Sequence, residues 1–84
     1  SMIHHSNLLC ESFNFITKQP EKKEFECTVR IRHRQPEQKA VAKLVGDGVE
    51  INFEKPQRAI AEGQYAVVYD GEVCLGGGVI DKKW

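Results

Sequence analysis

The sequence lacks any long apolar run, and no stretch approaches the roughly 18 consecutive apolar residues that a membrane-spanning helix needs. It also lacks a secretory signal, because no charged segment followed by an apolar stretch opens the chain. With 84 residues, of which 40% are hydrophobic and 29% charged, the composition fits one globular domain and excludes disordered and collagen-like classes. We therefore expect a cytoplasmic protein with no membrane partner.

An excess of charge of either sign is also absent, because twelve basic and twelve acidic side chains cancel. The net charge therefore gives no sign of a nucleic-acid partner, and such a function must rest on a local basic patch. The cysteines Cys10, Cys27 and Cys74 are too few and too widely spaced for a C-x-x-C metal or redox motif. We expect no metal site, and three buried thiols in a reducing compartment.

Alternating apolar and polar residues predict strands. Between Phe25 and His33 the odd positions are mostly apolar and the even positions polar, which is typical of a strand with one buried face. Turn residues predict two hairpins, one joining 40–45 to 49–54 and one joining 65–69 to 73–75. Near the N-terminus, Leu9, Phe13 and Phe15 alternate with polar residues and indicate one more strand. We find no convincing helix.

About six short strands in so small a chain must avoid exposing two long sheet edges, and closure is the usual solution. The predicted fold is all-β, a small closed or nearly closed antiparallel β-barrel of about six strands. The Ser1-Met2 start is typical of a cleaved expression tag. We accordingly expect residues 1–7 to be a tag remnant and disordered lead-in, and residues 8–84 to be one domain of a larger protein.

The segment around Arg30, Arg32 and Arg34 is the best candidate for a binding surface. If the strand continues that far, the three side chains share a face about 7 Å apart, close to the spacing of phosphates along a nucleic-acid strand. Guanidinium groups bind phosphate bidentately, so the row could contact RNA. The alternative is a solvated strand face whose arginines pair with glutamates such as Glu26 or Glu54.

Candidates for catalysis are weak. The run Gly76-Gly77-Gly78 lacks the Lys and Ser/Thr of a phosphate-binding loop, so a bend or a close backbone approach is the better interpretation. Cys74 has apolar neighbours on both sides, which predicts a buried and unreactive thiol. Gln64 follows a turn glycine, where its amide could either donate to a nucleotide or cap the turn. We expect no catalytic residue in this chain.

Four segments resemble, in order and spacing, the C-terminal domain of the tRNA-specific 2-thiouridylases (MnmA/TrmU family). They comprise residues 27–36, 53–59, 63–64 and 69–80. The resemblance implies a parent enzyme, a tRNA-uridine 2-sulfurtransferase, that activates the wobble uridine of tRNA with ATP and Mg²⁺ and receives sulfur from a persulfide donor protein. In the family the ATP loop and the working cysteines belong to the N-terminal domain, so the resemblance implies a non-catalytic piece without a cofactor of its own.

The same resemblance implies which residues contact tRNA. The positions that match the family's contacts are Arg32, His33 and Gln64, and Arg30 and Arg34 are weaker candidates. His33 stands where relatives usually have tyrosine, and as a contact it must lie at a strand end within reach of solvent. The competing hypothesis is a structural brace, which packs on the N-terminal catalytic and central domains of the parent without touching RNA.

Overall fold

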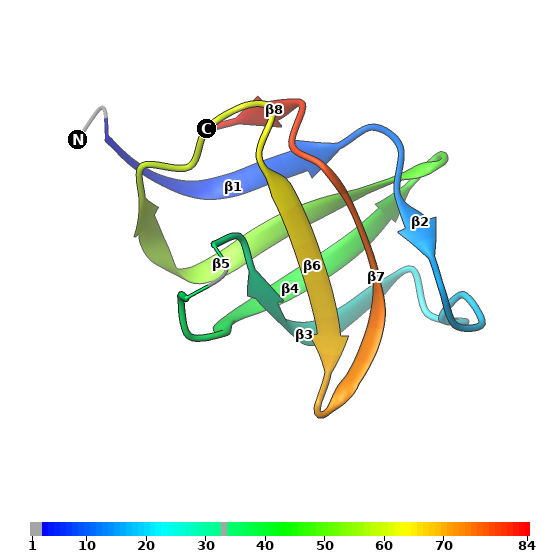
Figure 1. Cartoon of the computed structure of the whole chain (residues 1–84). Helices are drawn as coiled ribbons and strands as arrows, with labels where there is room; N and C mark the ends of the chain where they lie inside the picture. Colours follow the sequence, from blue (N-terminus) through cyan, green and yellow to red (C-terminus); the bar gives the residue numbers. More distant parts are fainter. Residues whose placement is uncertain (1–2, 33) are drawn as a thin grey trace.

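The computed structural model describes residues 3–32 and 34–84, and all its regular elements are strands (Figure 1). Their bounds are β1 (His4–Cys10), β2 (Asn14–Phe15), β3 (Glu24–Arg30), β4 (Gln38–Val45), β5 (Gly48–Arg58), β6 (Tyr65–Asp70), β7 (Val73–Val79) and β8 (Lys82–Lys83). All the strand pairs are antiparallel. No helix long and apolar enough to cross a bilayer occurs among the described residues.

The strands form one sheet in the order β2-β7-β6-β3-β4-β5-β1-β8. The pair at one end, β2 with β7, continues the pair at the other end, β1 with β8, along the same two stretches of chain. Leu8 pairs with Lys83, and Asn14, six residues further on, pairs with Gly77, six residues further back. The ladders β1·β8 and β2·β7 therefore share one register. A hydrogen bond of 2.8 Å from the Asp81 amide to the Leu9 carbonyl lies in the gap between them. The prediction of a nearly closed barrel is confirmed, with the first and last of its six passes each broken in two.

Both predicted hairpins are confirmed. Val45 pairs with Gly48 at the end of β4 and β5, and Asp70 pairs with Val73 at the end of β6 and β7. In each hairpin two residues connect the strands, because the turn glycines supply the positive φ that a two-residue connection needs. These local signals place four of the strands along the chain.

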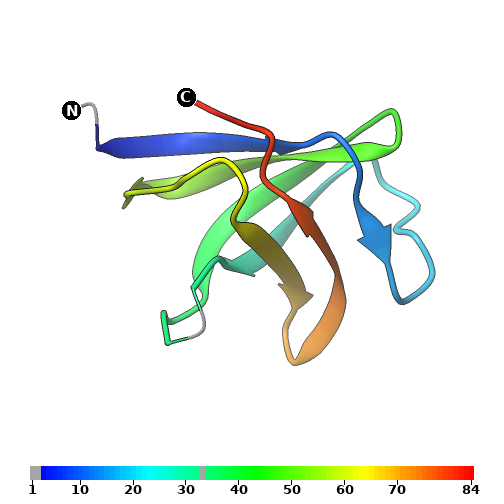
Figure 2. The ribbon, with the colours of Figure 1, turned by 45° about the horizontal axis from the view of Figure 1, so that its top comes forward.

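The N-terminal strand differs from the prediction. It is two strands, because the chain bends at residues 11–13 between β1 and β2, and Figure 2 shows the chain turning there from β1 toward β7. Leu8 and Cys10 are fully buried, whereas Leu9 lies on the outer face. Residues 4–7, expected to be a disordered lead-in, belong to β1, and His4, His5 and Asn7 pair with β5.

The barrel interior is filled by side chains from every long strand. The largest fully buried ones are Leu8, Ile51, Ile60, Ile80, Val29, Val49 and Val68. Gly76-Gly77-Gly78 packs against a neighbouring backbone, as predicted. A Cβ on Gly76 would lie 2.0 Å from the Asn14 carbonyl oxygen, so only glycine lets β2 approach β7 this closely.

Candidate nucleic-acid interface

The arginine segment leaves the sheet earlier than the sequence predicted. β3 ends at Arg30, whose last ladder partner is Val67 on β6. On the other side β4 begins pairing only at Gln38, because Pro36 has no amide hydrogen to extend the ladder. The prediction that Arg30, Arg32 and Arg34 lie in one row on an extended strand is therefore wrong.

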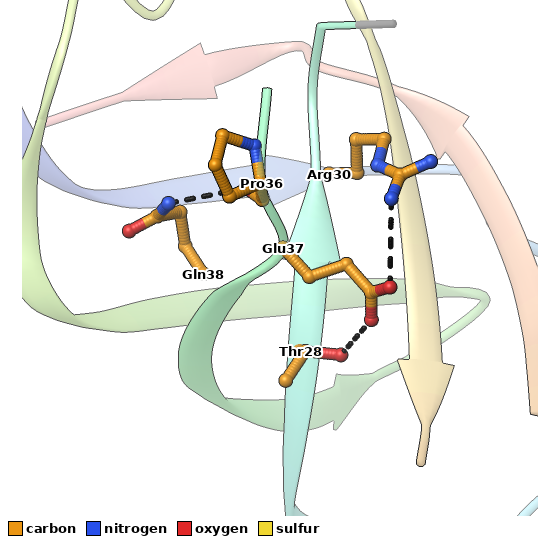
Figure 3. Close-up of polar contacts among 5 residues, drawn as sticks. All are labelled: Thr28, Arg30, Pro36, Glu37 and Gln38. Carbon is orange, nitrogen blue, oxygen red and sulfur yellow. Dashed lines mark hydrogen bonds and ion pairs between the residues drawn. The ribbon is translucent and has the colours of Figure 1, made fainter. Parts of the chain in front are cut away.

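Arg30 lies on the outer face of β3 and is paired, but not with the glutamates expected (Figure 3). Its Nη2 is 3.5 Å from Oε2 of Glu37 in the segment after the turn. Glu37 Oε1 in turn accepts a 2.6 Å hydrogen bond from the Thr28 hydroxyl. The Arg30 guanidinium carbon also lies 5.7 Å from the ring centroid of Tyr69 on β6, within cation–π range. Arg30 is thus held between Glu37 and Tyr69, two groups of the barrel itself.

Arg32 lies in the bend after β3 and points toward the end of β5. Its Nη1 donates to the Arg58 carbonyl at 3.2 Å, and its Nη2 donates to the Ala59 carbonyl. Lys83 Nζ donates to the next carbonyl, that of Ile60, at 2.9 Å. Two cations therefore hold three successive carbonyls at the start of the connection between β5 and β6, residues 59–64, which we call the β5–β6 turn.

Gln64 closes the same turn from its other end. Its Oε1 accepts the Ala61 amide at 2.9 Å, and its backbone carbonyl accepts the Ile80 amide at 2.7 Å. The turn-capping alternative is therefore present in the structure. Its Nε2 makes no hydrogen bond within the described part of the chain, so the amide can still donate outward. The fold thus brings Arg32 and Gln64 to one turn.

The other two candidates lie in the connection between β3 and β4. His33 lies outside the described residues. Arg34 is exposed in the turn that follows, and it has no ion pair among the residues that the structure describes. The predicted tRNA contacts at Arg30, Arg32, His33, Arg34 and Gln64 stay predictions.

Sequence reasoning missed a buried glutamine that fixes this region. Gln57 on β5 is only 6% exposed. Its Oε1 accepts from Gln35 at 3.3 Å, and its Nε2 donates to Gln38 at 3.4 Å and to the Lys55 carbonyl at 2.9 Å. These bonds tie the β3–β4 connection to β5. The alternation that marks residues 49–54 ends there, because residues 54–56 are all exposed, so no signal in the sequence pointed to an inward Gln57.

The thiols differ in burial. Burial raises the pKa of both Cys10 and Cys27 to about 12. Cys74 was predicted to be buried, but it lies half-buried on the outer side of β7. In the described part of the chain, no three His, Cys, Asp or Glu side chains gather closely enough to hold a metal ion.

The fold and this surface define a small antiparallel β-barrel domain whose most elaborate polar feature is a turn held by two cations. Residues 5–80 match the family model described as the aminomethyltransferase β-barrel domain. The chain therefore belongs to the family of aminomethyltransferase β-barrel domains.

Curated relatives narrow this further. The chain is 45% identical over 86 residues to the tRNA-specific 2-thiouridylase MnmA of Streptococcus thermophilus. It is 48% identical over 84 residues to that of Halalkalibacterium halodurans, and 44% identical over 86 residues to that of Streptococcus sanguinis. These matches take in 93–96% of this chain, which spans 23% of the length of each relative. The resemblance to the C-terminal domain of the 2-thiouridylases is confirmed.

Proposed function

We propose that this chain is the tRNA-contacting domain of a tRNA 2-thiouridylase, and that the β5–β6 turn is part of its contact surface. The observation that carries the proposal is the convergence of Arg32 and Gln64, distant in sequence, on this one turn. A guanidinium has five N–H donors, and the two carbonyls leave donors of Arg32 unused. Those donors, with the free amide of Gln64, suit a phosphate and an adjacent base or sugar.

The local charge supports the proposal in a chain whose net charge is zero. Arg58, at the end of β5, is exposed and its side chain has no partner among the described residues. Arg58, Arg32 and Lys83 therefore place three cations around the turn, against one carboxylate, Glu62, within it. A local basic patch of this kind attracts a phosphate backbone even where the whole domain is neutral.

For the whole protein we propose a cytoplasmic tRNA-uridine 2-sulfurtransferase that uses ATP and Mg²⁺ and a persulfide donor protein to thiolate the wobble uridine. The residues described here do not fit ATP. The glycine run is buried in β7 against residues of β6 and of the segment 10–15, so it cannot cradle phosphates. ATP binding and the reaction are therefore assigned to the N-terminal catalytic and central domains, while the barrel holds the RNA.

A structural brace is the second candidate, and one observation favours it. Arg30 and Arg32 are both occupied by groups of the barrel itself, and β6 and β7 leave Tyr65, Val73 and Val79 about half exposed. A brace would bury these apolar side chains against a neighbouring domain. Deleting the barrel would then lower the melting temperature of the whole protein and leave its tRNA affinity intact.

The proposal is tested by charge reversal in the full-length protein. Arg32→Glu should weaken tRNA binding roughly tenfold and raise KM for tRNA, because a phosphate contact becomes a repulsion. The kcat for 2-thiouridine formation should change little, because the barrel carries no reacting group. Binding is measured by filter retention and product by mass spectrometry of digested tRNA.

The matched control is Lys39→Glu, which makes the same change of net charge on the outer face of β4, where Lys39 has no ion pair with any described residue. It should alter tRNA affinity by less than about threefold. Melting temperatures of both variants establish that they are folded. Equal effects of the two reversals, or none from either, would refute a specific contact at the β5–β6 turn.

A further inference from the structure

The outer face of β6 carries an aromatic strip. Tyr65, Val67 and Tyr69 occupy alternate positions of the strand and face outward, whereas Ala66 and Val68 between them are fully buried. The two tyrosines are four residues apart, which is about 13 Å along a strand. Outward-facing aromatic side chains on a sheet are how several RNA-binding domains hold unpaired bases.

Tyr65 lies over Gly77 of β7 and is still open to solvent. A Cβ on Gly77 would lie 2.5 Å from Cε2 of Tyr65 and 3.1 Å from its Cζ, so the ring occupies the space that a side chain on β7 would fill. Tyr65 is still 50% exposed. One side of the ring thus lies against the backbone of β7 while the rest stays accessible, which is the arrangement that a stacking platform needs.

A cation lies beside the strip. Arg30 pairs with Val67 in the β3·β6 ladder, so its side chain lies beside the strip, with its guanidinium near the ring of Tyr69. Glu37 offsets the charge of Arg30 at 3.5 Å. Attraction for phosphate is weakened there, so stacking on Tyr65 must supply most of any binding energy at the strip.

We propose that this aromatic strip, formed by Tyr65, Val67 and Tyr69 with Arg30 beside it, binds unpaired nucleotides of RNA by base stacking, with Tyr65 as the exposed platform. The inference rests on the proposed function and extends it, because Tyr65 directly follows Gln64 and so continues the surface of the β5–β6 turn onto β6. The inference adds that the RNA bound at the strip is single-stranded. Duplex RNA does not fit, because its bases are stacked within the helix.

The test uses this 84-residue chain and a labelled single-stranded oligouridylate of about ten nucleotides, within the range of known single-strand sites. Tyr65→Leu keeps an apolar cover over Gly77 but removes the ring. It should weaken binding roughly tenfold, measured by fluorescence anisotropy, and leave the salt dependence of binding unchanged. Tyr65→Phe should bind within about twofold of the original chain, since it retains the stacking surface.

Trp84→Leu is the matched control, because Trp84 is also an exposed aromatic residue, at 51%, but follows β8 and pairs through its backbone with Ser6 and Asn7 of β1 rather than with β6. Its binding should be unchanged. A loss as large as that of Tyr65→Leu, an unaffected Tyr65→Leu, or no measurable binding by the original chain would overturn the proposal. So would equal affinity for a duplex of the same length.

Two further outcomes separate this inference from the function on which it rests. If Arg32→Glu weakens tRNA binding while Tyr65→Leu does not, the tRNA-contacting role stands and the strip is rejected. If Tyr65→Leu instead weakens association of the barrel with the rest of the parent protein supplied in trans, the strip is a protein-docking surface and the RNA assignment is wrong.

Discussion

A methyl group on residue 78 would collide with the backbone of the bend between β1 and β2. A Cβ there would lie 2.5 Å from the Ser12 carbonyl oxygen and 3.2 Å from Cβ of Cys10. Gly78 does not have a positive φ, so space and not backbone conformation demands glycine. Gly46 is the opposite case, because its φ is +57° and nothing lies within 4 Å of its added Cβ.

These two glycines give a matched pair of substitutions. We expect Gly78→Ala to lower the free energy of unfolding by about 3 kcal/mol, because the clash forces β7 away from the bend at residues 11–13. Gly46→Ala should cost about 1 kcal/mol, the penalty for a left-handed alanine. Urea unfolding of both variants measures the difference. Equal losses would contradict the close approach of β7 to residues 10–14.

The buried thiols of Cys10 and Cys27 should make the free energy of unfolding fall as the pH becomes alkaline. Burial raises both pKa values to about 12, and nearby Asp81 and Asp70 add smaller contributions for Cys10 and Cys27 respectively. Above about pH 8.5 the unfolded chain releases these two protons while the folded chain retains them. The unfolded state then binds fewer protons, so stability falls as pH rises from about 9 to about 12.

The expected slope is up to about 1.4 kcal/mol per pH unit for each thiol. It is measured as the free energy of unfolding in urea at a series of pH values. The double variant Cys10→Ala, Cys27→Ala should lose this part of the slope while keeping that due to tyrosines and lysines. A parallel pH dependence in the original chain and the variant would show that the thiols ionise as readily folded as unfolded.

Residue burial was predictable where alternation is regular and not where it fails. Cys27 lies within the alternating segment of β3 and is buried as expected. Cys74 lies between Val73 and Leu75. Because both neighbours are apolar, the sequence does not show which of the three residues face the core. The ladder between β6 and β7 shifts register beside it, between Val68 and Tyr69, and leaves Cys74 on the outer side.

At the scale of elements, residues close together in the sequence predicted the hairpins. Contacts between residues far apart in the sequence decided where the strands end. The turn residues and the alternation beside them lie within a few positions of each other, so both hairpins were foreseen. The end of β3 depends on where β4 and β6 stop pairing. The acceptors of Arg32 come from the end of β5, 26 and 27 residues along the chain. No local pattern contains that information.

The break between β1 and β2 has the same origin. Residues 10–14 pass close to two other strands, because Cβ atoms on Gly48 and Gly76 would lie 2.1 Å from the Cys10 carbonyl and 2.0 Å from the Asn14 carbonyl. The bend therefore fits only because glycines on β5 and β7 leave room for its backbone. The sequence indicated a close approach at the glycine run but not which segment approaches.

For the whole molecule, the alternation and the turn residues together predicted a nearly closed all-β domain correctly, and a net charge of zero placed any RNA contact in a local patch. The candidate site was only partly predictable. Family resemblance named Arg32 and Gln64, and the structure brought both to the β5–β6 turn. The strand row that first drew attention to the arginines does not exist, because β3 ends at its first member, Arg30.

The most direct test of the central claim is a filter-binding titration of this 84-residue chain against tRNA over a series of salt concentrations. A domain that holds tRNA through the β5–β6 turn should bind at low salt and lose affinity as salt rises. The Arg32→Glu variant should have a salt slope smaller by about one. Binding that is absent at low salt, or indifferent both to salt and to Arg32, would contradict the account.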